Sequence, residues 1–383
     1  MKSYCKIIFN ELRHIFYLDR RRGILLMLAS VAYMLVFSWL YLFGVVKEVP
    51  LLVVDQSNTV LSRQLARDFA DSDGFRLEAM ASSTEAAEEW LTHNRHCAAL
   101  YIPPDFATNI ARRQQSEVLV AMEGSNIILT SNSSIAAVEV LRKFNARTAQ
   151  QLLERDARQL PGQGEQRTAP VRFRYRLLHN PQLDYLIFFV YGLALVALQQ
   201  GVLLSVAAGV LWNGNRHLPE ELAMGTYGGW LLKSGVYWIL GILSYAACLA
   251  LGRLCFNLPV LGDWRQHLLL GGSFVFCLTQ LGGLLALIAD DELLFSRLSI
   301  FYTVPAFMLS GYTWPLEAMP AWVRAIAYCS PFTYLASAAR SLCLGGVCHD
   351  LPERAALLLL LGLLCFPGAA KMYRKGLRRA AMS

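Results

Sequence analysis

The sequence predicts an α-helical polytopic membrane protein with six transmembrane helices and a separate mixed α/β domain between the first two. Of its 383 residues, 55% are hydrophobic and 16% are charged, and the mean hydropathy is +0.38. Soluble domains carry about a quarter charged residues, so much of this chain is expected to face lipid. Long uncharged runs alternate with short polar segments, and one polar stretch is long enough to fold as a domain.

Basic residues flank the apolar part of the chain at both ends, and they predict its topology. The N-terminal set is Lys2, Lys6, Arg13, Arg20, Arg21 and Arg22, and the C-terminal set is Lys371, Arg374, Lys375, Arg378 and Arg379. Lys and Arg favour the cytoplasmic side, so both termini are expected inside and the number of spans is even. A basic tail could instead bind nucleic acid, but these residues adjoin membrane segments, so we expect a lipid bilayer and no nucleic acid as partner.

The N-terminal part is predicted to lie on the membrane and then cross it. Residues 1–22 form a cytoplasmic segment in which apolar positions recur at helical spacing over 4–18, as in an interfacial amphipathic helix. Residues 23–46 are uncharged and long enough to span. This run is too long for a cleavable signal peptide and lacks a small-residue cleavage site, so it is expected to remain as an anchor.

Residues 47–180 have the composition of a folded α/β domain, which the inside N-terminus places outside the cytoplasm. The predicted strands are 49–54, 75–80, 98–102 and 118–122, and the predicted helices cover 61–69, 84–91, a segment opened by 103–106, and a long stretch from 127 toward 159. Asp55 and Asp105 are interpreted as turn residues in preference to ligand-binding ones. His93, His96 and Cys97 form a weak metal-site pattern with no second cluster, and we expect no metal.

Residues 181–371 are predicted to form a block of five spans, followed by a basic cytoplasmic tail at 372–383. The spans are 185–211, 229–251, 267–289, 298–314 and 355–370. Gln199 and Gln200 lie inside an apolar run, so they either bond to another helix or line the transport pathway. Lys233, near the inner end of its span, is expected to extend its charge to the membrane surface.

Prolines divide the stretch 310–340 into short pieces. Pro315, Pro320 and Pro331 each remove a backbone donor, which excludes one continuous helix. Trp314 and Trp322 suit a membrane–water interface. Composition alone also allows an ordinary extramembrane loop. Beyond it, Cys343 and Cys348 could pair in an oxidising compartment, and the sequence leaves that open.

The order S-G-x-x-x-P-x-x-x-M-P, then S-P and a Tyr followed by Arg, resembles the C-terminal signature of ABC-2-type transporter permeases. The domain segments V-x-L-L-V-V-D-x-S-N, A-A-L-Y-I-P-P-D-F and E-G-S-N also resemble the outer domain of that family, with Glu123 as a mild departure. The resemblance implies a re-entrant helical hairpin at 310–340 on the outer face. The gate residues expected there are Gly311, Pro315, Glu317, Met319, Pro320, Arg324, Pro331, Tyr334 and Arg340.

The same resemblance implies a segment at 212–228 that couples the permease to an ATPase. Relatives usually carry an E-R-E-x-G-T-like pattern there, whereas this chain lacks the Arg between the acids. A solvated turn is the alternative interpretation. Pro219 is well placed to start a short helix with the glutamates in its first turn. The expected coupling residues are Pro219, Glu220, Glu221, Leu222, Met224, Gly225 and Thr226.

No enzymatic motif occurs in the sequence. It contains no G-x-x-x-x-G-K-[ST], G-x-S-x-G or H-E-x-x-H, and its isolated histidines are interpreted as interface or loop residues. We therefore expect no catalytic residue and no cofactor bound by this chain, and the resemblance implies that ATP and Mg²⁺ bind to a partner ATPase.

The resemblance, together with the membrane segments, implies the multi-pass permease subunit of an ATP-binding-cassette exporter in the bacterial inner (plasma) membrane. The partners that the resemblance implies are an ABC ATPase and a second permease, with a periplasmic adaptor of the membrane-fusion type as a further one. A non-transporting scaffold or receptor, whose outer domain binds a partner, is the alternative function. A polytopic enzyme is disfavoured because no catalytic constellation is present. The sequence does not identify the substrate.

Overall fold

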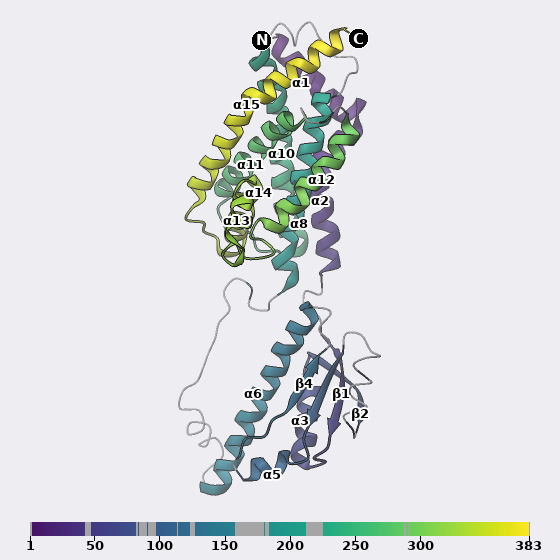
Figure 1. Cartoon of the computed structure of the whole chain (residues 1–383), viewed down its shortest axis with the longest axis vertical. Coiled ribbons are helices and arrows are strands. Elements are labelled where there is room, and N and C mark those ends of the chain that lie inside the picture. Colours follow the sequence, from purple (N-terminus) through teal and green to yellow (C-terminus); the bar gives the residue numbers. More distant parts are fainter. Residues whose placement is uncertain are drawn as a thin grey trace. The chain divides into compact units, whose positions relative to one another are not determined.

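The computed structural model describes residues 2–42, 47–81, 83, 90, 97–112, 114–122, 127–157, 180, 184–211, 225–286, 289 and 291–382. The chain divides into two compact units. The membrane unit comprises Met1–Gly44 and Leu177–Ser383, and the α/β unit comprises Val45–Arg176 (Figure 1).

Six helices in the described part of the chain are long and apolar enough to cross a membrane, as the sequence predicts. They are α2 (Arg20–Leu40), α8 (Tyr185–Leu211), α10 (Gly225–Phe256), α11 (Trp264–Leu285), α12 (Glu292–Leu309) and α15 (Leu351–Met382). This is the composition of a multi-pass membrane protein, because a bilayer requires about 20 apolar residues per helical crossing.

The six helices differ in how much of their surface the protein covers. In α8 and α11, 67% of the most apolar window is buried, whereas in α2, α12 and α15 only 28% is. The exposed side of α12 carries Ile300, Phe301, Val304 and Met308. Helices α8 and α11 therefore form the centre of the bundle, and the outer helices present apolar side chains as lipid-facing surfaces do.

Several predicted helix boundaries are corrected by the structure, most clearly the start of α12 and the end of α15. Helix α12 starts at Glu292, earlier than the predicted 298, because the Asp291 carboxylate accepts a hydrogen bond from Leu294 N at 2.6 Å and caps the helix. Helix α15 continues through the predicted basic tail as far as Met382. Tyr373 and Leu377 lie in that extension and are 1% and 2% exposed, so packing against the bundle extends the helix.

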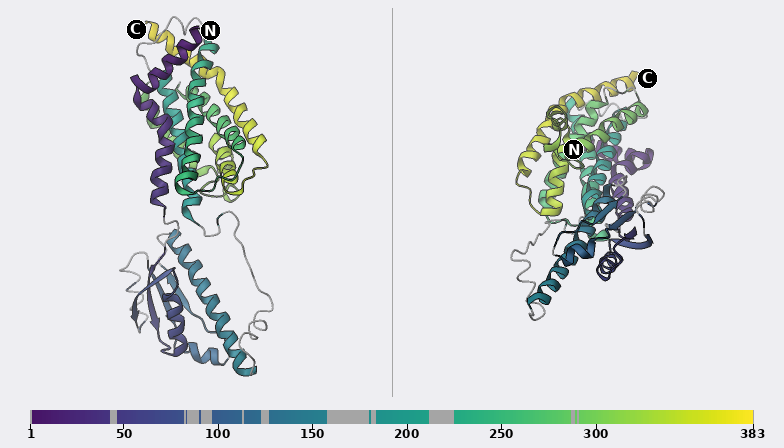
Figure 2. Two further views of the ribbon diagram at one scale, coloured as in Figure 1. Left: turned by 180° about the vertical axis from the view of Figure 1, so that it is seen from behind. Right: turned by 60° about the horizontal axis from the view of Figure 1, so that its bottom comes forward.

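The N-terminal amphipathic segment is helical. Helix α1 (Lys2–Arg13) leads into the π-helix η1 (His14–Leu18), and Ile7 and Ile15 bury one face of the pair. Helix α1 packs on α10. Seen from both sides, α1 and the end of α15 lie at the same end of the bundle (Figure 2).

The proline-rich stretch folds as short helices at the opposite end of the bundle (Figures 1 and 2). They are the 3-10 turn η2 (Leu316–Ala318), α13 (Ala321–Tyr328), α14 (Pro331–Arg340) and the π-helix η3 (Ser341–Gly345). Pro331 occupies the first position of α14, where its missing N–H is no loss. Gly311 has φ +82°, a left-handed conformation that reverses the chain after α12.

The α/β unit contains a four-stranded mixed sheet, built from the four strands that the sequence predicts. Its strand order is β2 (Phe75–Ala81), β1 (Val49–Asp55), β3 (Ala98–Ile102) and β4 (Leu119–Met122). Strand β1 pairs parallel with both β2 and β3, whereas β3 and β4 are antiparallel. The central β1 is buried on both faces, which explains its unbroken run of apolar residues.

Helices cover one face of this sheet. Helix α3 (Val60–Ala70) contributes Leu65 and Phe69 to the core, and α6 (Ile127–Ala157) contributes Val140 and Phe144. The short α5 is Phe106–Ala111, so the prolines of the predicted segment precede the helix and do not start it. Most of the predicted helix 84–91 lies outside the described residues.

The packing of α8 against the α12–α13 connection can be tested by substituting glycines. A Cβ atom added at Gly192 would lie 2.4 Å from the Tyr312 ring, whereas one added at Gly235 of α10 meets nothing within 4 Å. Gly192→Ala should lower the melting temperature of the detergent-purified protein, because overpacking costs about 1–3 kcal/mol. Gly235→Ala, the matched control, should leave it unchanged or raise it. Equal melting temperatures for both variants would contradict this packing.

Candidate functional site

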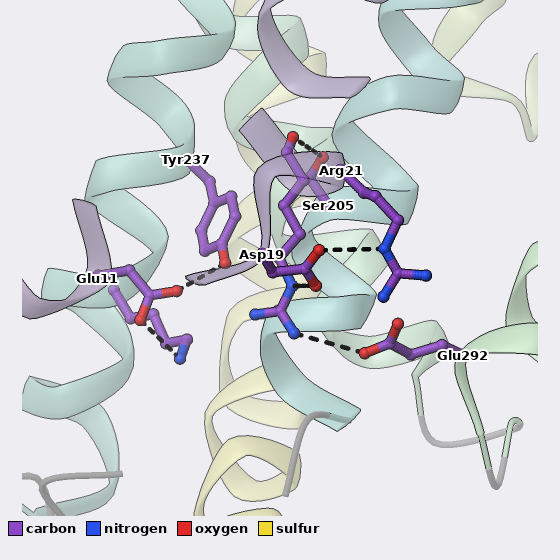
Figure 3. Close-up of polar contacts among 8 residues, drawn as sticks. Glu11, Asp19, Arg21, Ser205, Tyr237 and Glu292 are labelled. Carbon is purple, nitrogen blue, oxygen red and sulfur yellow. Dashed lines mark hydrogen bonds and ion pairs between the residues drawn. The ribbon is translucent and has the colours of Figure 1, made fainter. Parts of the chain in front are cut away.

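Buried charges mark the end of the membrane unit at which α1 lies. Glu11 of α1 and Lys233 of α10 are each 5% exposed. Lys233 Nζ lies 2.9 Å from Glu11 Oε2, and the Tyr237 hydroxyl donates a hydrogen bond to Glu11 Oε1 at 2.6 Å (Figure 3). The expectation that Lys233 extends to the membrane surface was therefore wrong, because its charge is paired inside the protein.

The environment of Glu11 favours its ionised form. Burial by itself raises the pKa of this carboxyl, but the charge of Lys233 and the hydrogen bonds from Tyr237 and Lys233 outweigh burial, so the pKa lies below the ordinary 4.5. The ionised carboxylate therefore stabilises the folded state above pH 4.5, and this contribution is lost as the pH falls through the lowered pKa.

Arg22, at the start of α2, extends this network to two further helices. It is 3% exposed, and its guanidinium lies 2.9 Å from Asp19 Oδ2 and 3.4 Å from Glu292 Oε1 at the start of α12. Ser205 of α8 donates a hydrogen bond to the Arg22 carbonyl at 3.1 Å (Figure 3). We call the set the α1-end cluster, and it consists of Glu11, Asp19, Arg22, Ser205, Lys233, Tyr237 and Glu292.

The α1-end cluster fixes how five elements meet. Removing one partner of a buried ion pair costs about 3–5 kcal/mol, because a charge is left without compensation. Relative movement of α1, α2, α8, α10 and α12 at this end therefore requires the ionic contacts to move together or to exchange partners. Such an arrangement is suited to transmitting movement between the helices.

Several of the predicted gate residues come together at the other end of the bundle. A cavity of about 550 Å³, here called the α14 cavity, is lined by Gly311, Pro315, Glu317, Tyr334 and Arg340 from the predicted set. It is also lined by residues of α8 and α15 that the sequence did not single out, namely Phe188, Glu353, Arg354 and Leu357. The remaining predicted residues, Met319, Pro320, Arg324 and Pro331, do not line it.

Arg340 holds the predicted hairpin against α8. Its Nη2 donates a hydrogen bond to the Tyr312 carbonyl at 2.5 Å. The guanidinium carbon lies 3.8 Å from the centroid of the Tyr312 ring and 4.7 Å from that of Phe188. The two rings beside the guanidinium compensate the charge of Arg340, which has no carboxylate partner among the described residues.

The two glutamines of α8 have different environments. Gln200 accepts a hydrogen bond from Thr303 at 2.6 Å and donates one to Ser299 at 2.7 Å, so it bonds α8 to α12. Gln199 is fully buried, and its side-chain amide has no hydrogen-bond partner among the described residues. Of the two predicted alternatives, Gln200 thus has the bond to another helix. Neither glutamine borders the α14 cavity.

Most of the predicted coupling residues fall outside the described part of the chain. These are Pro219, Glu220, Glu221, Leu222 and Met224. Gly225 starts α10 with φ +73°, and the backbone of Thr226 continues that helix. The coupling segment thus connects α8 to α10, the helices that carry Ser205 and Lys233.

The described residues include part of the predicted metal pattern and both cysteines of the predicted pair. Among the described residues, no group of three or more His, Cys, Asp or Glu side chains could hold a metal ion, and His93 and His96 lie outside them. Cys343 and Cys348 are both free thiols. His267, interpreted as an interface or loop residue, is instead fully buried near the start of α11.

Sequence reasoning missed the α1-end cluster, although it carried a signal. Ile7, Glu11 and Ile15 are spaced four residues apart and share one helix face, so an acid interrupts the apolar stripe of α1. Lys233 is likewise a solitary charge in an apolar run. Two opposite charges on two otherwise apolar faces indicate a pair, because each alone would be costly to bury.

Comparison with known proteins agrees with this architecture. Residues 21–371 match the family model described as ABC-2 family transporter protein. The probable multidrug ABC transporter permease YbhR of Escherichia coli (strain K12) is 22% identical over 303 residues, which are 78% of this chain and 78% of YbhR. The probable multidrug ABC transporter permease YbhS of the same strain is 26% identical over 117 residues, which are 30% of this chain and 31% of YbhS. Because the family model covers both the α/β unit and nearly all of the membrane helices, this chain belongs to the ABC-2 transporter family, as a multi-pass membrane subunit of an ABC transporter.

Proposed function

We propose that this chain is the permease subunit of an exporter that moves its substrate outward across the bacterial inner membrane. The observation that carries the proposal is the family match over residues 21–371, which includes the α/β unit as well as the membrane helices. ATP and Mg²⁺ would bind to a separate ATPase, since the sequence has no phosphate-cradling G-x-x-x-x-G-K-[ST] loop.

The proposed orientation rests on charge. Basic residues lie in α1, at the start of α2 and at the end of α15, all at one end of the bundle, which supports a cytoplasmic location for that end. They include Arg13, Arg20, Arg21, Lys371, Arg374, Lys375 and Arg378. Helix α2 starts at this end and leads into the α/β unit, so that unit would lie in the periplasm.

We propose that the ATPase docks on residues 212–224 and that the α1-end cluster transmits its movement. Pro219, Glu220 and Glu221 suit the start of a short docking helix, and Leu222 and Met224 would fill an apolar cleft on the ATPase. Helices α8 and α10 flank this segment, and both hold members of the α1-end cluster. ATP hydrolysis can then shift a two-state bundle through contacts that differ between the states.

The predicted hairpin would form the outer gate, and the α14 cavity would lie beside it. The relatives YbhR and YbhS are named as probable multidrug permeases, which supports small organic molecules as the substrate class. A second permease would complete the pathway. A periplasmic adaptor of the membrane-fusion type is a further proposed partner, for which the α/β unit is the available surface.

The proposed topology can be tested by labelling. A cysteine at Ser83 of the α/β unit should react with a membrane-impermeant thiol reagent in intact cells, because it would face the periplasm. A cysteine at Ser383 should react only after the cells are permeabilised. Labelling is measured above the level of the parent protein, which has its own cysteines. Reaction of Ser383→Cys alone in intact cells would reverse the topology.

The docking segment can be tested by a single charge. Leu222→Asp should reduce copurification of the ATPase at least about tenfold, because a charge buried without a partner is costly. Membrane insertion should be unchanged. Leu222→Met keeps the apolar contact and is the matched control. If Leu222→Asp retains both its ATPase and export, the ATPase docks elsewhere.

The ion pair of the α1-end cluster can be tested by a double-mutant cycle. Lys233→Met alone should destabilise the purified protein by about 3–5 kcal/mol, because it leaves Glu11 buried and uncompensated. Glu11→Gln combined with Lys233→Met should recover most of the loss, as measured by thermal unfolding.

The control is the same substitution at an exposed ion pair. Lys143 Nζ lies 2.7 Å from Glu139 Oε1, with the two side chains 70% and 57% exposed. Lys143→Met should therefore cost less than about 1 kcal/mol. Equal effects at positions 143 and 233 would show that the buried pair has no special role in stability.

A further inference from the structure

The α14 cavity has the size and lining of a small-molecule site. Its volume of about 550 Å³ lies within the range of about 300–1,000 Å³ that is usual for ligand pockets. Five elements contribute to its wall, which are α8, the segment from Gly311 to Glu317, the end of α13, α14 and the start of α15. All of them belong to the membrane unit.

The cations of the cavity are already compensated by the protein. Arg340 is held by the Tyr312 carbonyl and by two aromatic rings. Arg354 donates a hydrogen bond to Ser337 and lies 3.3 Å from Asp350 Oδ2. Arg340 Nε has no hydrogen-bond partner among the described residues, but it is buried and therefore offers no donor to a ligand in the cavity. Arg354 is already paired with Asp350.

Two carboxylates of the cavity wall lack such compensation among the described residues. Glu317 and Glu353 are exposed, and within the described part of the chain neither has an ion-pair partner. With Asp350 they give the wall three acids against Arg340 and Arg354, so its formal charge is negative.

Aromatic and aliphatic groups occupy the wall between the charges. The rings of Tyr328 and Tyr334 have centroids 6.5 Å apart, and the Tyr334 hydroxyl donates to the Tyr328 carbonyl at 2.8 Å. Leu316 and Leu357 add apolar surface. Arg340, stacked on Tyr312, already shows how this wall accommodates a cation. Aromatic faces attract cations through their quadrupole, and they also favour apolar substituents.

We infer that the α14 cavity binds an amphiphilic organic cation, with Glu317 and Glu353 as counter-charges and the tyrosine pair as its apolar contact. This inference rests on the proposed function only for its role, which is to hold a substrate beside the outer gate. Binding itself requires no ATPase and no export.

The test measures binding of radiolabelled tetraphenylphosphonium to the full-length protein in phosphatidylcholine nanodiscs, with empty nanodiscs subtracted. The wild-type protein should bind it saturably, and tetraphenylborate, which has the same shape and the opposite charge, should bind more weakly. Glu317→Gln with Glu353→Gln removes both counter-charges at constant volume and should weaken phosphonium binding about tenfold. Glu139→Gln, on α6 of the other unit, should have no effect.

Two substitutions of opposite charge at position 357 give an independent readout. Leu357→Arg should weaken phosphonium binding about tenfold, whereas Leu357→Glu should leave it unchanged or strengthen it. Wild-type affinity in both Leu357→Arg and the double glutamine variant, or preference for the borate, would overturn the inference. Either result would leave the permease assignment intact, because copurification of an ATPase with the wild-type protein tests that assignment separately.

Discussion

The ionic contact between Glu11 and Lys233 determines how one end of the bundle is assembled. Both side chains are almost fully buried, and neither charge could remain there without the other. Helix α1 is amphipathic and could by itself lie on any membrane surface. Its buried acid, bonded to Lys233 and Tyr237, gives it a defined position on α10. Arg22 then extends the same electrostatic network to α2 and α12.

Charged side chains are compensated in different ways at the two ends of the membrane unit. At the α1 end, acids and bases neutralise each other inside the protein, which produces a rigid junction of five elements. At the α14 end, the arginines are compensated largely by rings, carbonyls and hydroxyls, and two carboxylates beside a cavity have no ion-pair partner among the described residues. A rigid junction suits the transmission of movement, and an open cavity with free charge suits contact with a small molecule. The two ends of the bundle are therefore suited to different kinds of contact.

Much of this architecture could be predicted without coordinates. The six apolar helices, the four strands and the proline-broken stretch were all recognisable, because hydropathy, strand periodicity and proline act over short windows. The sequence also carried the family signature in residues 310–340 and in the α/β domain. Errors concerned boundaries and single residues. Helix α15 runs beyond its predicted end because Tyr373 and Leu377 pack against the bundle, which no local pattern reveals.

Local composition therefore determined which segments cross the membrane and on which side the basic ends are expected to lie. The tertiary structure decided which charges meet. Glu11 and Lys233 are far apart in the chain, and each by itself is compatible with a solvated or interfacial side chain. The same holds for Gln200, which bonds to Ser299 and Thr303, and for Arg340, which stacks on Tyr312. Electrostatic and hydrogen-bond partners are fixed by distances of a few ångströms between helices, and a one-dimensional pattern contains no such distances.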